Sequence, residues 1–302
     1  RVSFPWSMID KITPHPSERV QEELGRLGVA DMAIARTNTG TLIAPFVNAE
    51  ITEYLVLEDA FPNGRPALEG AGGYLTDRTT VEKAEKMKVG TCLNPLHTAL
   101  AVYGCLLGYT SIAAEMGDAD LKALVEQIAA ESLPVVEDPG ILSPRAFIDE
   151  VLHERFPNPA IPDTPQRIAA DTSQKLPVRY GGTLRRYARQ SEQALAGLEF
   201  APLVFAGWCR YLLGVDDRGN AMPVSPDPML PQLQAHLKGI EVGRPDSLAG
   251  QLRPILSNAA LFGVDLYAAG LGERTEEMFR DMLAGPGAVR ATLHRNCACK
   301  QP

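Results

Sequence analysis

The chain has 302 residues, a formal net charge of -8, 45% hydrophobic residues and 22% charged residues. This composition is that of a globular protein with a large core, and its acidic balance argues against a nucleic-acid partner or an anionic membrane surface. No apolar run is long enough to span a membrane and no signal peptide is recognisable, so we expect a cytoplasmic protein with reduced cysteines.

The first part of the chain carries its β-like region. Proline and serine before residue 18 predict a helix over 18–27 that ends at a glycine. Short strands are predicted within 30–60, and the glycine- and proline-rich residues 60–74 predict a loop. Residues 70–73 (GAGG) lack the GxGxxG spacing of a dinucleotide-binding turn, so we expect no such site there.

From residue 79 onward the pattern is helical. A charged helix is predicted over 80–88, and an apolar helix follows the Asn94-Pro95 pair to about residue 116. The remaining predicted helices are 118–132, 143–155, 164–172, 182–197, 198–213, 228–237, 247–257 and 264–284. We therefore predict a mainly α fold with one small β element near the N-terminus.

Three polar side chains of catalytic type lie where a charged run gives way to an apolar run at residues 100–109: Lys88, Asn94 and His97. An apolar environment lowers the pKa of a lysine amine, which makes Lys88 a candidate acid or base. Glu85 precedes Lys88 by three residues and shares its helix face. The simpler alternative is that Lys88 ends a solvated helix and His97 is an ordinary helix residue.

The five cysteines show no regular spacing. The three in apolar contexts are expected to be buried thiols: Cys92, Cys105 and Cys209. Near the C-terminus, His294, Cys297 and Cys299 form an HxxCxC pattern that could hold part of a metal site. A fourth ligand is lacking nearby, so we expect no metal.

Several motifs follow one another in an order typical of one family. Residues 4–14 (FPWSMIDKITP) are similar to the pattern F-x-x-S-x-V-D-R-I-T-P, and residues 54–69 to V-I-E-D-x-F-x-x-G-R-P-x-x-E. Lys88, Asn94 and His97 resemble the motif K-x4-N-x-x-H. Together they resemble the mannitol dehydrogenase family of polyol-specific long-chain dehydrogenases, and most of all its fructuronate reductase branch.

The chain departs from that family pattern near the lysine. Five residues, rather than four, separate Lys88 from Asn94, and Lys86 is the weaker candidate for the family lysine. Family members also begin with a Rossmann-type NAD-binding domain. We therefore expect residues 1–302 to be the C-terminal domain of a longer polypeptide, with 1–16 as the junction, 30–60 as the β element and 79–302 helical.

The resemblance implies a 6-phosphogluconate-dehydrogenase-like helical domain and an NAD-dependent, metal-independent reduction of D-fructuronate to D-mannonate. It implies that Lys88 is the general acid or base and that Asn94 and His97 polarise the substrate. Glu85 would then relay protons to solvent. Tagaturonate reductase and mannitol 2-dehydrogenase are the alternative activities, and a non-enzymatic helical binding or oligomerisation module is the alternative of another class.

A uronate substrate carries a carboxylate that must be bound. Lys175 and Arg179 are candidates, because the two cations lie four residues apart with a proline between them, and the fork of an arginine suits a carboxylate. Asn48 and Glu50, after an apolar run, are expected to line the cleft. The alternative for the two cations is a pair of surface charges at a helix start.

Other charged and aromatic residues favour structural roles. We expect Arg65 to pair with Glu58 or Asp59 and clamp a loop. Asp10 and Lys11 are expected to be structural at the domain junction, and Trp6 and Trp208 to lie in the core. A solvated helix face is expected for three arginines: Arg185, Arg186 and Arg189.

Overall fold

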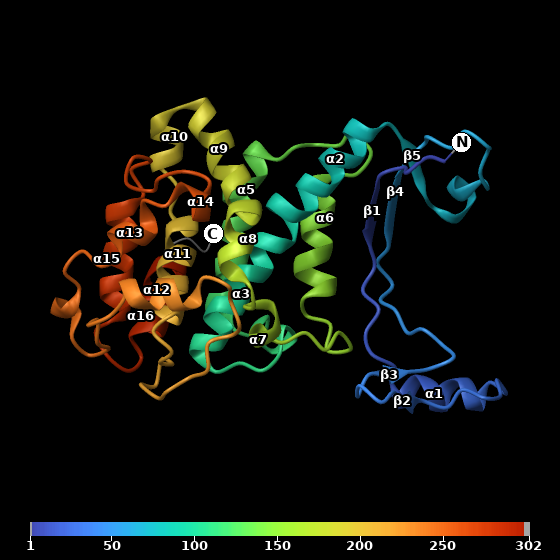
Figure 1. Ribbon diagram of the computed structural model, residues 1–302, viewed down its shortest axis with the longest axis horizontal. Helices are drawn as coiled ribbons and strands as arrows, with labels where there is room; N and C mark the ends of the chain where they lie inside the picture. The colour runs from blue at the N-terminus through green and yellow to red at the C-terminus, as the bar shows by residue number, and fades with distance from the viewer. Residues whose placement is uncertain (1, 299–302) are drawn as a thin grey trace. The chain divides into compact units, whose positions relative to one another are not determined.

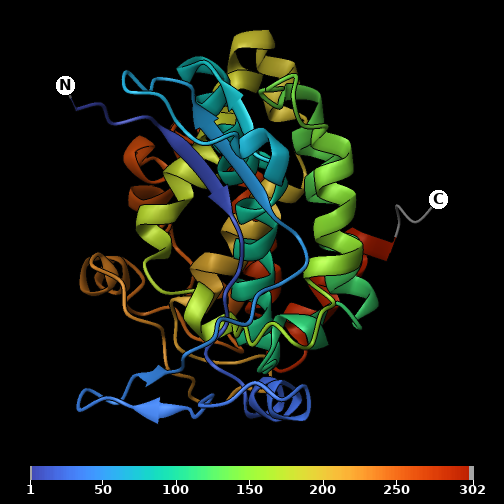
Figure 2. The same cartoon turned by 90° about the vertical axis from the view of Figure 1, so that its right-hand side faces the viewer.

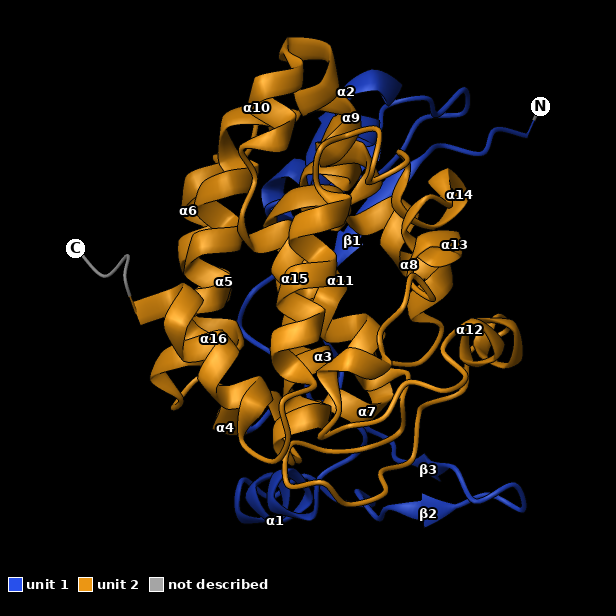
Figure 3. Cartoon of the chain, turned by 90° about the vertical axis from the view of Figure 1, so that its left-hand side faces the viewer, with its two compact units in different colours: residues 1–82, 160–162 blue, residues 83–159, 163–302 orange. Residues whose placement is uncertain are grey.

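The computed structural model of the protein describes residues 2–298 and divides the chain into two compact units. Unit 1 comprises residues 1–82 with 160–162, and unit 2 comprises 83–159 with 163–302 (Figure 3). Within residues 2–298, none of the helices has the length and apolar character needed to cross a bilayer.

Unit 1 contains a three-stranded sheet in the order β1-β4-β5 (Figure 1). The antiparallel strands β1 (Ser7–Asp10) and β4 (Tyr54–Glu58) lie side by side, with Ser7 opposite Leu57. Strand β5 (Tyr74–Thr76) pairs with β4 in parallel. Met8 and Val56 face each other across β1 and β4 and are almost fully buried, so one face of the sheet is packed.

Unit 1 also contains a short hairpin and the helix α1 (Figure 2). Strands β2 (Ala35–Arg36) and β3 (Leu42–Ile43) pair in antiparallel fashion around a turn. Helix α1 (Glu18–Arg26) confirms the predicted helix, but the side chain of Ser17 makes no capping hydrogen bond. None of the α1 residues is buried.

Two predictions in unit 1 are wrong, and a further one is confirmed. Trp6 is 45% exposed rather than in the core, and the Arg78 guanidinium lies 4.9 Å above its ring. Tyr74, predicted to end a loop, begins strand β5, because its backbone pairs with β4. Arg65 forms the expected ion pair with Asp59, 2.8 Å from Nη2 to Oδ2.

Unit 2 is helical. Helix α2 (Arg78–Met87) enters it from unit 1, and two π turns follow at Lys88–Cys92 and Val151–Arg155. The other helices are α3 (Asn94–Leu107), α4 (Ile112–Glu115), α5 (Ala119–Ser132), α6 (Pro144–Glu150), α7 (Pro165–Ile168), α8 (Thr172–Arg179), α9 (Gly181–Gln190), α10 (Glu192–Ala196), α11 (Phe200–Tyr211), α12 (Leu230–His236), α13 (Arg253–Leu256), α14 (Ala259–Phe262), α15 (Gly272–Met282) and α16 (Ala288–Ala298).

The core of unit 2 is built around α11, whose residues are all buried. Helices α3, α5 and α15 pack against it. The hydroxyl of Tyr103 on α3 donates to the carbonyl of Leu203 at 2.8 Å. A Cβ at Gly207 would lie 2.8 Å from the Tyr103 ring, so a glycine is needed for α3 and α11 to approach this closely.

Two carboxylates, the half-buried Glu131 and the buried Asp217, accept hydrogen bonds from backbone N–H groups at helix starts in unit 2. Glu131, at the end of α5, accepts from the backbone N–H of Glu199 at 2.6 Å and from that of Phe200 at the start of α11. Asp217 accepts from the N–H of Val289 at 2.8 Å at the start of α16. These contacts satisfy N–H groups that a helix leaves unpaired at its first turn.

The helix boundaries differ from the predicted ones where local signals compete. The helix predicted to run to residue 116 ends at Gly108, whose φ of 81° is left-handed, and α4 begins separately at Ile112. The helix predicted over 164–172 stops at Ile168, and the one over 182–197 breaks at Ser191. The mainly α fold with a small β element is confirmed.

Candidate functional site

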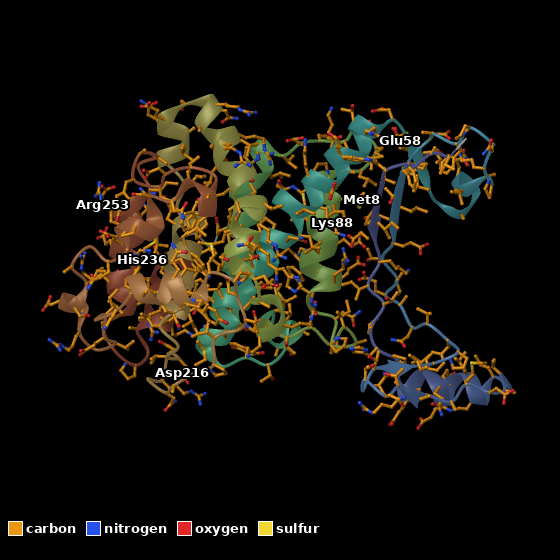
Figure 4. The ribbon with its side chains drawn as sticks, in the orientation of Figure 1. Met8, Glu58, Lys88, Asp216, His236 and Arg253 are labelled. Carbon is orange, nitrogen blue, oxygen red and sulfur yellow. The ribbon has the colours of Figure 1, made fainter. Side chains whose placement is uncertain are left out.

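The lysine, asparagine and histidine singled out above lie on consecutive elements of unit 2. Helix α2 ends at Met87, and a π turn over Lys88–Cys92 connects it to α3 (Figure 4 labels Lys88). The N–H of Leu93 donates to the carbonyl of Lys88 at 3.0 Å, five residues back along the chain. A π turn takes up one residue more than an α turn, so it accommodates the extra residue before Asn94, and a bend at Leu93 then leads into α3.

Asn94 and His97 stand on the first turn of α3, three residues apart on one face. Pro95 is tolerated there because the first helical N–H groups have no partner within the helix. The Asn94 carbonyl accepts from Thr98 Oγ1 at 3.0 Å. Within residues 2–298, the Asn94 side-chain amide makes no hydrogen bond, so its N–H groups can donate to a ligand.

His97 is nearly buried, with 14% of its side chain exposed, and its ring stands 5.1 Å from that of Phe156. Its Nε2 lies 3.4 Å from Asp163 Oδ2 but lacks the alignment of a hydrogen bond. Burial lowers the pKa of His97 to about 3, and four nearby cations add to the lowering: Arg179, Arg167, Arg155 and Lys175.

Asp163 alone would favour the charged imidazole, but Arg167 already engages that carboxylate with its own guanidinium. The burial and the four cations therefore decide the protonation state, and His97 is neutral near pH 7. A neutral imidazole can exchange a hydrogen bond with a hydroxyl group without carrying charge.

The two cations predicted to bind a carboxylate lie on α8, one turn apart, but their surroundings differ. Lys175 Nζ donates to the carbonyl of Ile168 at 3.0 Å and to that of Ala170, so it caps the end of α7. Arg179 donates from Nη1 to Thr98 Oγ1 at 2.7 Å, beside the first turn of α3.

Arg179 is the more available of the two cations. Burial lowers its pKa to about 10, and in the described part of the chain it has no carboxylate partner. Burial also lowers the pKa of Lys175, with Arg179 as a further cause. A desolvated guanidinium without a counter-ion favours the arrival of an anion.

Glu85 and Lys86 are exposed near the end of α2. Both line a cavity of about 550 Å³ in unit 2, which is bounded also by residues of the π turn, α8 and α9. Lys86 Nζ lies 3.6 Å from Glu137 Oε2, so it faces that cavity rather than the first turn of α3. Lys88 itself is half-buried and does not line the cavity.

Asn48 and Glu50 belong to unit 1, where both contact backbone groups. Glu50 Oε1 accepts from the N–H of Ile12 at 2.7 Å, and Asn48 Nδ2 donates to the carbonyl of His15 at 3.2 Å. These contacts tie the chain before β4 to the chain after β1. A role for these two residues in substrate binding stays a prediction.

The HxxCxC pattern and the buried thiols also have defined surroundings. His294 Nδ1 lies 2.8 Å from Asp120 Oδ1, Cys297 is buried, and Cys299 lies outside the described residues. Cys92, Cys105 and Cys209 are buried thiols, as predicted, and Trp208 lies in the core.

Arg186 departs from the predicted solvated face, because only 19% of its side chain is exposed and Nη1 pairs with Glu137 Oε1 at 3.0 Å. The surroundings of His97 were not predicted either. In the sequence, Asp163 is recognisable only as the residue before a helix start, and nothing marks Phe156 or Arg167. All three are distant from His97 along the chain and lie near it only in the folded structure.

Comparisons with known proteins agree on one family. Residues 80–275 match the family described as the mannitol dehydrogenase C-terminal domain. The chain is 58% identical over 294 residues to a D-mannonate oxidoreductase of Thermotoga maritima, covering 97% of this chain and 54% of that protein. It is 32% identical over 285 residues to a mannitol 2-dehydrogenase of Aspergillus niger, covering 87% of this chain and 49% of that protein.

A solved structure is similar over nearly the whole chain. The mannitol 2-dehydrogenase of Pseudomonas fluorescens, in a ternary complex with NAD and D-mannitol, superposes with a TM-score of 0.72 at 30% identity. The match covers 99% of this chain and 55% of the Pseudomonas chain. The chain thus spans about half the length of the relatives it matches.

Proposed function

This chain belongs to the mannitol dehydrogenase family, and we propose that it forms the substrate-binding and catalytic domain of an NAD-dependent oxidoreductase that interconverts D-fructuronate and D-mannonate. The observation that carries this proposal is the 58% identity, over 97% of the chain, to a protein named D-mannonate oxidoreductase. Mannitol 2-dehydrogenase is the second candidate, favoured by the likeness to the Pseudomonas structure. Tagaturonate reductase is a third.

Reduction of a ketone places negative charge on the carbonyl oxygen and requires a proton. Lys88 is the proposed acid in reduction and the base in oxidation, because it is half-buried at the end of α2 and begins the turn that leads to Asn94. A positioned acid or base contributes about 10²–10⁴-fold to the rate. Glu85, one turn earlier and exposed, is the proposed relay of that proton to solvent.

Asn94 and His97 would polarise the substrate. The Asn94 amide, which has no partner among residues 2–298, would donate to the developing oxyanion, a contact worth about 10²–10³-fold in rate. His97 would hydrogen-bond the reacting hydroxyl or its neighbour through Nε2, which is buried and unpaired. Because this imidazole is neutral near pH 7, it orients the substrate without competing with Lys88 for the proton.

Arg179 is the proposed partner of the substrate carboxylate. Its guanidinium is half-buried beside the first turn of α3, close to the two polarising residues, and the described residues offer it no acidic partner. Lys175 adds positive charge from the same face of α8 while it holds the end of α7. A uronate would gain from this arrangement and an uncharged ketose would not.

The proposed reaction transfers a hydride between NAD and the substrate carbon. The glycine-rich segment does not fit a dinucleotide, because it forms a single 3-10 turn over Leu68–Ala71, ended by Gly72 at a φ of 84°, and not the start of an α-helix. Such a helix start is what binds the pyrophosphate of NAD. We therefore propose that a further domain of the same polypeptide holds NAD.

Activity of the complete polypeptide on three substrates tests this proposal. NADH oxidation should be slowest with D-fructose, which alone of the three lacks a carboxylate. It should be faster with D-fructuronate than with D-tagaturonate, because D-fructuronate is the ketone partner of D-mannonate. A preference for D-fructose would favour mannitol 2-dehydrogenase instead. No turnover of any of the three would favour a non-enzymatic binding module.

A further inference from the structure

A polar cavity in unit 2 is lined by Glu85, the proposed proton relay, but not by the three residues proposed to act on the substrate. The cavity of about 550 Å³ described above is lined by Glu85, Lys86, Val89, Gly90, Glu137, Pro177, Val178, Gly182, Arg185, Arg186 and Arg189. Its volume lies within the range of small-molecule sites, which is roughly 300–1,000 Å³. Lys88, Asn94 and His97 do not line it, so it is not the place where the proposed reaction occurs.

The charges around this cavity are unbalanced. One lysine and three arginines face two carboxylates, a local excess of two positive charges in a chain whose net charge is -8. Glu137 is shared, since it pairs with Arg186 at 3.0 Å and with Lys86 at 3.6 Å. Within the described residues, Arg185 and Arg189 have no carboxylate partner.

The charge of Arg186 is only partly compensated, so an anion would stabilise it. Its Nε is buried and makes no hydrogen bond, although Nη1 donates to Glu137 Oε1 at 3.0 Å and Nη2 to Thr91 Oγ1 at 3.5 Å. Burial lowers the pKa of Arg186, and the charges of Arg185 and Arg189 on the same helix add to the lowering while Glu137 opposes it. The positive charges of these three arginines repel one another, and a bound anion would offset that electrostatic repulsion.

We propose that this cavity binds the phosphate monoester of a small, sugar-sized metabolite. A phosphate monoester carries about -1.5 to -2 charges at pH 7, which matches the local excess, and its oxygens suit guanidinium forks. Val89, Pro177 and Val178 supply an apolar wall for the carbon skeleton of the ligand. A monocarboxylate would leave one positive charge uncompensated.

A ligand in this cavity would act on the turn that begins at Lys88. The Gly90 carbonyl accepts from Thr183 Oγ1 at 3.0 Å, and Arg186 Nη2 donates to Thr91 Oγ1 at 3.5 Å. Helix α9 therefore holds the π turn, and an anion that fixes Arg186 fixes the turn as well. The consequence for catalysis rests on the proposed function of Lys88, whereas binding does not.

Calorimetric titration of the chain with glucose 6-phosphate tests the site, with glucose and malate as the other ligands. Glucose 6-phosphate should bind saturably, inorganic phosphate should compete with it, and glucose should not bind. The double variant Arg185→Gln/Arg189→Gln should weaken binding about tenfold or more, because two cations that face the phosphate are removed. Arg145→Gln, which replaces an exposed arginine of α6, should leave binding unchanged. Circular dichroism checks that the double variant is folded.

Three results would overturn the proposed site: no saturable binding at millimolar glucose 6-phosphate, equal affinity in the double variant, or binding of malate alone. Hydrogen exchange of the Leu93 amide, which donates to the Lys88 carbonyl, tests the coupling. Exchange should slow with glucose 6-phosphate in the wild type but not in the double variant. Unchanged exchange would overturn the coupling, and inactivity of the complete polypeptide would overturn only the proposed function.

Discussion

Because of Glu115, the free energy of unfolding of unit 2 should fall as pH rises. Glu115 ends helix α4 and is fully buried, and both of its carboxyl oxygens lack a hydrogen-bond partner in the described part of the chain. Burial raises its pKa from 4.5 to about 9, and the charge of Asp118 adds to the rise. The folded protein therefore keeps a proton at pH 7 that the unfolded chain has released.

The magnitude follows from the two pKa values. Well below pH 4.5 both states are protonated and the titration of Glu115 does not change stability, and above that pH the unfolded chain releases the proton while the folded protein keeps it. Stability should therefore fall by about 1.4 kcal/mol per pH unit, or about 4 kcal/mol between pH 5 and pH 8. Replacement with glutamine removes the titration and keeps the shape of the side chain.

Urea unfolding of the wild type and of Glu115→Gln at pH 5, 6, 7 and 8 measures this difference. The wild type should lose stability relative to the variant at each step, with the full gap at pH 8. Glu126→Gln, on the exposed face of α5, is the control and should follow the wild type at every pH. Parallel profiles for the wild type and Glu115→Gln would refute the reasoning, because they would mean that Glu115 titrates equally in both states.

Three further outcomes are expected. In steady-state assays of the complete polypeptide, Arg179→Ala should lower kcat/KM for D-fructuronate by about 10–100-fold and leave kcat/KM for D-fructose nearly unchanged. Only the uronate has a carboxylate that loses its partner. An equal loss for both substrates would contradict the assignment. The imidazole ¹⁵N shifts of His97 should stay constant from pH 5 to pH 8, since its pKa is about 3; titration near 6.5 would be inconsistent with its burial. Gly104→Ala should destabilise the protein in urea by about 1–3 kcal/mol, because the new Cβ would lie 2.2 Å from Glu115 Oε1, and unchanged stability would show that the carboxyl can move away.

Some elements follow from local sequence because local chemistry decides them. Helix α5 is predictable from its apolar spacing and from Asp118, which accepts from the N–H of Leu121 as a cap. Gly104 and Gly108 lie in the same apolar run, yet one packs under a carboxyl within α3 and the other ends the helix. The difference depends on what each glycine contacts in three dimensions, which the pattern does not contain.

The candidate site is predictable in part for the same reason. The residue types and spacing of Lys88, Asn94 and His97 are visible in the sequence, and so is the extra residue between the first two. That a π turn takes up this residue depends on how the turn packs against α8 and α9. The neutral state of His97 depends on cations brought from segments distant in the chain.

Lys88 is the proposed proton donor on which the function depends. Lys88→Ala should reduce the rate of NADH-dependent D-fructuronate reduction by the complete polypeptide by about 10²–10⁴-fold, while the Kd for D-mannonate changes little. Lys83→Ala, which replaces an exposed lysine of α2, the helix that leads to Lys88, is the matched control and should keep wild-type activity. The most direct measurement is the single-turnover rate of the Lys88→Ala variant. A large loss is the result expected of a proton donor, and a rate within a few-fold of the wild type would contradict it.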